Sequence, residues 1–173
     1  MVGRNRFQMT ETRHCVVFSL DDRYFALPLS AVERIARAAA ITPLPSKMDL
    51  VMGVINLQGR ILPVVNKRKR FSMTEKPLSA DHHFIVGRTH DKQVAILVDN
   101  VLDITEIPES ELVSRNEILS TLPFISGVIK QQEDMVLVHD LDELLSPKDL
   151  EKIEKAVNTL KKKSSAKTTG RKK

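Results

Sequence analysis

The chain has little of the chemistry that stabilises secreted domains or builds cysteine-based metal sites. Its 173 residues include one cysteine, Cys15, and no tryptophan. A single cysteine cannot form an internal disulfide framework or a cysteine-based zinc site. Because Cys15 lies in the apolar run "HCVVFSL", we interpret it as a small core residue rather than as a nucleophile.

Long apolar runs are also absent. No apolar stretch approaches the ~18 residues that a membrane-spanning helix requires, and the N-terminus shows no apolar signal core. We therefore expect a soluble, cytoplasmic protein that inserts no segment into a membrane.

No group of residues predicts catalysis. The stretch "GVINLQG" lacks the Gly-Lys-Ser/Thr end of a phosphate-binding loop. Of the five histidines, His82 and His83 are adjacent, so on a strand their side chains point to opposite faces and cannot share a metal. We expect no enzyme: no catalytic residue, no cofactor and no metal.

Positive charge is concentrated at the C-terminus. The formal charge is +5, yet residues 161–173, "KKKSSAKTTGRKK", hold seven basic residues and no acid. Residues 1–160 then hold 20 basic and 22 acidic residues. A Lys/Ser/Thr segment buries too little apolar area to order itself, so we predict a disordered, solubilising tail. The alternative is an electrostatic arm for RNA, a membrane or an acidic partner.

A second basic run comprises Lys67, Arg68, Lys69 and Arg70. On a strand these side chains alternate between faces, so they cannot all contact one ligand. Phe71 is the one aromatic residue next to the run, whereas a groove that binds nucleic acid usually offers several aromatic side chains for base stacking. We interpret the run as a solvated strand end or a protein-contact surface, with phosphate or nucleic-acid binding as the alternative.

The body of the chain contains a duplication. Residues 15–29 and 83–98 each read as strand, turn and strand. Spaced aliphatics follow at an offset of 69: Val32 and Ile35 in the first copy, Val101 and Ile104 in the second. Gly-Val-Ile then recurs at 53–55 and 127–129, each time before another hairpin.

Short strands at this spacing predict an all-β protein of two SH3-like, five-stranded β-barrels with a C-terminal α-helix. For residues 31–41 we expect one helical turn followed by a strand. Ser146 and Pro147 predict the start of the C-terminal helix, and its apolar face is Leu150, Ile153, Val157 and Leu160. The expected boundaries are an N-terminal extension (1–13), a first barrel (14–81), a second barrel (82–146), the helix (147–163) and the basic tail (164–173).

The duplicated unit and "GVINLQGRILPVVNKRKRF" (53–71) resemble the CheW family of bacterial chemotaxis adaptors. That family shows Gly-Val-Ile-Asn-Leu-Arg-Gly, a Pro-containing apolar strand and then Asp-Leu-Arg. Residues 53–57, Gly59 and residues 61–65 match, and the resemblance spans about residues 14–146. The chain departs from the family in three places: Gln58 replaces its Arg, Asn66-Lys67 replaces its Asp-Leu, and Arg34 replaces its acid.

The resemblance implies a non-catalytic adaptor that couples the tip of a methyl-accepting receptor to the regulatory domain of a CheA-type histidine kinase. It also implies a location at the inner face of the membrane through receptor arrays, and weak self-association there. No nucleic-acid partner is expected. The rival hypothesis is a basic SH3-like barrel that binds nucleic acid through the tail and the 67–70 run.

The residues that the resemblance assigns to partner binding come from the first copy of the repeat. They are Val32, Arg34, Ile35, Gly53, Asn56, Leu57, Gln58 and Gly59. We expect Gly59 to adopt a positive φ in its turn. We also expect Gln58 and Arg34 to lie together and hydrogen-bond, in place of the family's ion pair.

Overall fold

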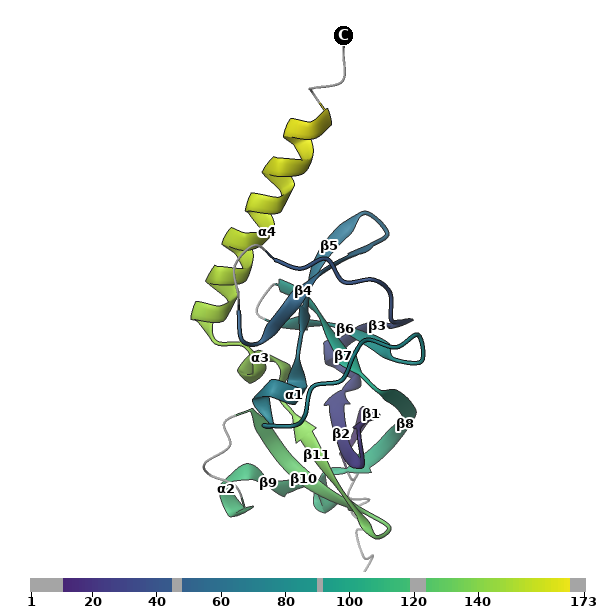
Figure 1. The fold of residues 1–173 in the computed structure, drawn as a ribbon. Coiled ribbons are helices and arrows are strands. Elements are labelled where there is room, and N and C mark those ends of the chain that lie inside the picture. The colour runs from purple at the N-terminus through teal and green to yellow at the C-terminus, as the bar shows by residue number, and fades with distance from the viewer. Residues whose placement is uncertain (1–10, 45–47, 90–91, 119–123, 169–173) are drawn as a thin grey trace, which may run out of the picture.

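Strands dominate the structure, a computed structural model that describes residues 11–44, 48–89, 92–118 and 124–168 (Figure 1). The strands before the midpoint are β1 Thr12–Leu20, β2 Arg23–Pro28, β3 Val32–Arg37, β4 Val51–Leu57 and β5 Arg60–Val65. Those that follow are β6 His83–Thr89, β7 Lys92–Val98, β8 Asn100–Pro108, β9 Val113–Ser114, β10 Ile125–Gln131 and β11 Asp134–His139. The helices are η1 Leu29–Ala31, α1 Lys67–Arg70, η2 Glu109–Glu111, α2 Arg115–Ile118, α3 Leu141–Leu144 and α4 Pro147–Thr168.

The strands form two sheets. One has the order β3-β6-β7-β5-β4 and the other the order β8-β1-β2-β11-β10-β9. The sheets do not close into complete barrels, although the segment after β3 bridges to β4 through Thr42 and Val54. The all-β, SH3-like class is confirmed. The helical turn and strand expected within residues 31–41 both occur, but earlier in the chain, as η1 and β3.

Each copy of the repeat gives its opening hairpin to the sheet of the other copy. The hairpin β1–β2 pairs with β8 and β11, and the hairpin β6–β7 pairs with β3 and β5. The predicted boundaries at 14–81 and 82–146 are therefore wrong as a division of the sheets. We call residues 29–98 the first module and residues 12–28 with 99–146 the second module.

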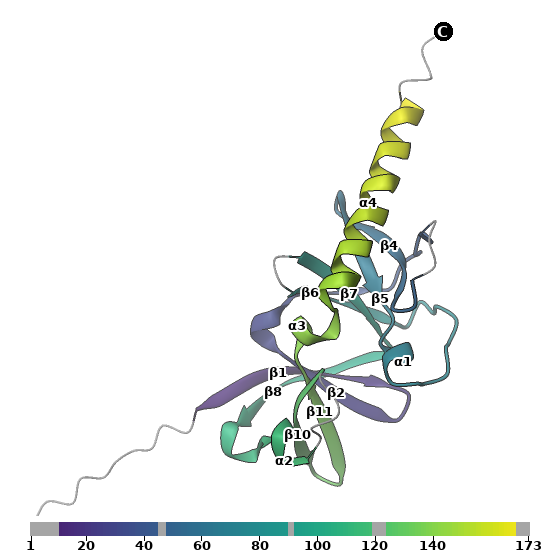
Figure 2. The same ribbon diagram turned by 90° about the vertical axis from the view of Figure 1, so that its left-hand side faces the viewer.

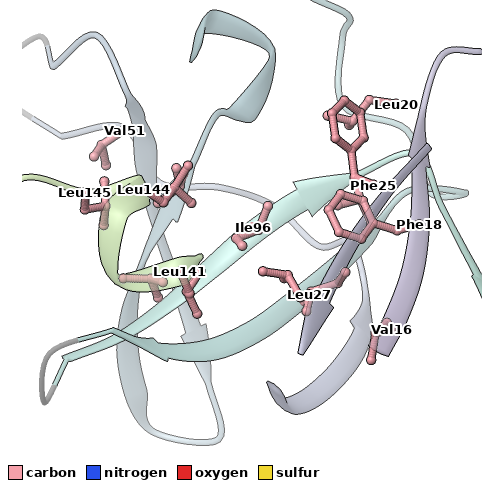
Figure 3. Close-up of a cluster of buried hydrophobic side chains, with 14 of the residues drawn as sticks. Val16, Phe18, Leu20, Phe25, Leu27, Val51, Ile96, Leu141, Leu144 and Leu145 are labelled. Carbon is pink, nitrogen blue, oxygen red and sulfur yellow. The ribbon is translucent and has the colours of Figure 1, made fainter. Parts of the chain in front are cut away.

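Alternation along the strands builds three layers of core. On β1, Val16, Phe18 and Leu20 face a central cluster between the sheets, while Cys15 and Val17 face the interior of the second module. The central cluster joins β1 and β2 to β6, β7 and α3, and Figure 3 shows Ile96 between Leu27 and Leu141. Cys15 is buried, as predicted. One shared core therefore holds the two modules together.

The C-terminal helix begins as predicted but ends later. The Ser146 hydroxyl accepts from the Asp149 N–H at 3.2 Å, and the Asp149 carboxylate accepts from the Ser146 N–H at 3.0 Å, which is a reciprocal cap. Helix α4 continues to Thr168, so the prediction of disorder from residue 164 is wrong through residue 168. Lys and Ala have high helix propensity, and they extend a helix that Ile153 and its neighbours have already docked.

Candidate functional site

A β-bulge shapes the first predicted contact strand. Val32 lies opposite Gly87 and Ile35 opposite Ile85, with a register shift at Glu33. Residues three apart on a regular strand point to opposite faces, but the extra residue returns both side chains to one face. Val32 packs against the central core. Ile35 lies on the same face, opposite the core residue Ile85, and its side chain is 38% exposed. Val32 and Ile35 thus form an apolar edge at the rim of that core.

A matching edge lies on the second module. Val101 is opposite Phe18 and Ile104 opposite Val16, again with one extra residue, Leu102, between them. Val16 and Phe18 belong to the same central core as Ile85, and Ile104 is 52% exposed. The list of predicted contact residues missed this edge, although the offset of 69 marks it.

Arg34 leaves the opposite face of β3. It lies opposite Val86, which belongs to the interior of the first module, and its side chain is exposed. Among the described residues, no hydrogen bond or ion pair joins Arg34 to Gln58, so the expected contact between them is not formed.

Glu33, the residue before Arg34, connects β3 to the β6–β7 hairpin. The Glu33 carboxylate accepts from Arg88, with the Arg88 Nη2 atom 2.9 Å away, and also from the Gln93 amide. Gln93 in turn accepts from Arg60 Nη1 at 2.9 Å. This polar chain runs across β6 and β7 to the start of β5, and no sequence pattern pointed to it.

The β4–β5 hairpin carries the remaining predicted residues. Gln58 and Gly59 have φ values of 52° and 84°, which suits a two-residue type I′ turn and confirms the positive φ of Gly59. The Asn56 side-chain oxygen accepts from the Gly59 N–H at 2.8 Å, so Asn56 stabilises the turn. Gln58 is exposed at the tip.

Two of the predicted residues are structural. A Cβ atom on Gly53 would lie 2.3 Å from the carbonyl oxygen of Thr42, so the close approach of these strands requires glycine. Leu57 is half-buried and packs against the interior of the first module. Exposed contact chemistry is therefore left to Gln58 in the β4–β5 turn and to Arg34 and Ile35 on β3, where Val32 is half-buried.

The run Lys67 to Arg70 is not a solvated strand end. It forms α1, whose N-cap Asn66 accepts from the Arg68 N–H at 3.0 Å. Lys67 and Arg68 are buried, and Arg70 donates to the Leu144 carbonyl at 2.8 Å. The interpretation as a solvated strand end is wrong, because a helical turn directs Lys67, Arg68 and Arg70 into the junction of the modules and leaves only Lys69 exposed. Buried side chains of this run are also unavailable to nucleic acid.

Arg68 joins three segments at that junction. Its guanidinium contacts the carboxylates of Asp21 and Asp99, each at 2.6 Å, and donates to the Thr74 carbonyl. Hydrogen bonding from Arg68 and then Lys76 lowers the pKa of Asp21 to about 2. A carboxyl with a lowered pKa stabilises the fold above its unfolded value, and that contribution is lost as the pH falls from about 4 to about 2.

Lys67 occupies an apolar chamber. It is 1% exposed, and its Nζ atom lies 4.6 Å from the centre of the Phe18 ring and 5.5 Å from that of Phe25. Among the described residues, neither this Nζ nor the ring nitrogens of the buried His139 has a hydrogen-bond partner. Burial lowers the pKa of Lys67, and burial followed by the nearby Lys67 lowers the pKa of His139.

Within the part of the chain that the structure describes, no group of three or more His, Cys, Asp or Glu side chains could hold a metal ion. A helix long and apolar enough to span a membrane is likewise not found among those residues. The site's most distinctive chemistry is therefore its two exposed apolar edges and the polar chain beside them, which suit protein contact.

Comparison with known proteins agrees with this fold. The family model described as the CheW-like domain matches residues 14–149. The chemotaxis protein CheW of Thermotoga maritima is 33% identical over 130 residues, 74% of this chain and 84% of the relative. CheW of Treponema pallidum is 26% identical over 144 residues, 80% of this chain and 85% of the relative.

A solved structure shares the fold. The crystal structure of the scaffolding protein TtCheW from Thermoanaerobacter tengcongensis superposes with a TM-score of 0.72 at 26% identity, covering 79% of this chain and 94% of that one. With the family model matching most of the body, the chain belongs to the CheW family of chemotaxis proteins.

Proposed function

We propose that the chain is a non-catalytic adaptor that couples methyl-accepting chemoreceptors to a CheA-type histidine kinase. It would act in the cytoplasm, in arrays at the inner face of the membrane. Family membership and the likeness to a scaffolding protein support an adaptor. The observation that carries the proposal is the pair of equivalent apolar edges, Val32–Ile35 and Val101–Ile104, exposed at the rim of one core.

The apolar edges are the proposed receptor contact. Each edge presents a partly exposed isoleucine beside a valine that packs on the central core, so the rigid core holds both edges in place. Exposed apolar side chains on a fixed scaffold suit the apolar face of a partner helix. The exposed side chains of Gln58 and Arg34 would then adjust which receptor is chosen.

The direct experiment titrates the full chain against the purified regulatory domain of such a kinase and, separately, against a receptor-tip fragment. We expect association with both. Lys152→Ser, an exposed change on α4, is the control and should bind as the wild type does. Absence of association with the kinase domain at high micromolar concentration would contradict the proposal.

Two of the three departures from the family, Gln58 and Arg34, provide a finer test. Since no hydrogen bond or ion pair joins these two residues among the described residues, we expect Gln58→Arg and Arg34→Glu to change receptor-stimulated kinase activity independently, so that the effects of the two single changes add in the double variant. Both residues are exposed, so the fold should be nearly unchanged. A double variant whose effect departs clearly from that sum would show that the two residues are coupled and would contradict this expectation.

A further inference from the structure

The two modules carry opposite charge. The first module, residues 29–98, holds 11 basic and 5 acidic side chains, a formal charge of +6. The second module, residues 12–28 and 99–146, holds 4 basic and 13 acidic side chains, a formal charge of −9. The near-neutral body is thus two charged halves joined through one core.

The far half of α4 is a basic arm. After Glu154 the chain has eight basic residues and no acid. Leu160 is the last half-buried apolar residue of the helix, and residues 161–166 are all exposed, among them Lys161, Lys162 and Lys163. Figures 1 and 2 show this arm leaving the body at one end, with the β10–β11 hairpin at the opposite end. The arm therefore points away from the acidic module of its own chain.

The acidic module offers a matching hollow of about 160 Å³ at the tip of that hairpin. Asp103, Asp134, Gln132 and Tyr24 contribute to its lining. Since a water takes about 30 Å³ of liquid volume, the hollow suits the end of one long side chain. Leu102 also lines the hollow, and its apolar side chain is 50% exposed.

The acidic character of the hollow is not a consequence of the fold. At the offsets of the repeat, Asp103 corresponds to Arg34 and Asp134 to Arg60. The equivalent place on the first module is therefore basic. The charge inversion is specific to these side chains and complements the lysines of the arm.

Other polyanions fit the arm less well. Residues 161–173 contain no large apolar side chain that could enter a lipid interface. They also contain no aromatic side chain on which bases could stack. Every copy of the chain that carries this basic arm also carries the acidic second module, so the arm and an acidic surface are always present at equal concentration.

We propose that the lysine-bearing end of α4 in one copy docks on the acidic hollow of the second module of another copy. The contact joins unlike surfaces, so each added copy leaves a free arm at one end and a free hollow at the other. This contact does not depend on the proposed adaptor function, and it can be measured on the purified chain alone.

The first test is the mass of the full chain by sedimentation velocity over a range of concentrations. At about 0.01 M salt, where screening acts over about 30 Å, we expect concentration-dependent association. At about 1 M salt, where it acts over about 3 Å, we expect a monomer. A monomer at every concentration in low salt overturns the proposal, and so does binding of anionic lipid vesicles by a chain that stays monomeric.

The second test is charge reversal with a matched control. Lys162→Glu with Lys163→Glu should weaken association on the order of tenfold or more, because two attractive contacts become repulsive. Lys148→Glu with Lys152→Glu changes the charge equally on the same helix outside the arm, and it should leave most of the association intact. Equal loss in both variants would assign the effect to net charge and overturn the docking site.

The third test restores the contact with exchanged charges. Asp103→Lys with Asp134→Lys should also reduce association. An equimolar mixture of this variant with Lys162→Glu/Lys163→Glu should associate again, because an acidic arm then meets a basic hollow. Truncation after Leu160 should keep the fold and abolish association. A mixture that stays monomeric, or a truncated chain that still associates, contradicts the proposal.

Discussion

The two modules share a strand plan and differ in the chemistry of equivalent residues. Helices α1 and α3 occupy equivalent positions, and both begin at a capping side chain, Asn66 and Asp140. The first buried residue of each helix is Lys67 in one and Leu141 in the other. A common backbone thus tolerates opposite chemistry inside its core, and the differences between equivalents locate what is particular to this chain.

The largest expected effect concerns the two glycines that follow the bulges of β4 and β10. A Cβ atom on Gly53 would lie 2.3 Å from a backbone oxygen, whereas one on Gly127 would meet the flexible end of Leu112 at 2.6 Å and the Val113 oxygen at 2.8 Å. We expect Gly53→Ala to lower the free energy of unfolding by about 3 kcal/mol and Gly127→Ala by about 1–2 kcal/mol. Denaturant unfolding measures both, and an equal or smaller cost at Gly53 would contradict the difference between the modules.

The next effect replaces the buried lysine by its equivalent. Lys67→Leu removes a buried amine without a hydrogen-bond partner among the described residues, and we expect it to raise the free energy of unfolding by about 1–3 kcal/mol at neutral pH. Lys69→Leu, an exposed change in the same helix, is the control and should have little effect. Thermal and denaturant unfolding of the wild type, Lys67→Leu and Lys69→Leu measure these differences in the free energy of unfolding.

The gain from Lys67→Leu should depend on pH. Burial holds the pKa of Lys67 well below its usual value of 10.5, while the unfolded chain keeps the usual value. Between these two values the unfolded state binds one proton more, so wild-type stability rises with pH. The advantage of the leucine variant should therefore shrink as the pH approaches about 10. A gap that is constant or widens would mean that Lys67 is protonated in the folded chain.

The smallest effect compares the hairpin turns. Gln58 and Gly59 both have positive φ, whereas in the equivalent turn, all of which the structure describes, only Gln132 does, at 57°. Gly59→Glu should cost about 1 kcal/mol of unfolding free energy through strain of the left-handed backbone, and Glu133→Gly about 0.5 kcal/mol or less. If Glu133→Gly costs more than Gly59→Glu, the two turns do not differ as described.

Local sequence patterns predicted the strands and turns of this fold, but they did not predict which strands pair with each other. Alternation and turn residues identified the duplicated hairpins, and Ser146 with Pro147 marked the start of α4. Strand partners were missed, because alternation shows which residues are buried but not which strand lies beside them. The end of α4 was missed because composition alone ignores the helix that precedes residue 164.

Only part of the candidate site was predicted, because residue type alone does not show where a side chain lies in the fold. Judged by residue type, Lys67 and Arg68 belong at the surface, and only the repeat offset to Leu141 signals that the first of them is buried. The same offset links Ile35 to Ile104, but the predicted list kept to the first copy. Gly53 was predicted as a partner-contact residue, and the role that the structure gives it is close packing against the backbone of Thr42.

The central claim is that the equivalent apolar edges form one partner-binding surface. The most direct measurement is receptor-stimulated kinase activity, reconstituted with Ile35→Ser, Ile104→Ser and the control Met135→Ser, an exposed apolar residue on β11 that belongs to neither edge. The account predicts that each isoleucine variant lowers stimulation while the methionine variant retains it, with all three folded. Undiminished stimulation by both isoleucine variants, or equal loss in all three, would contradict it.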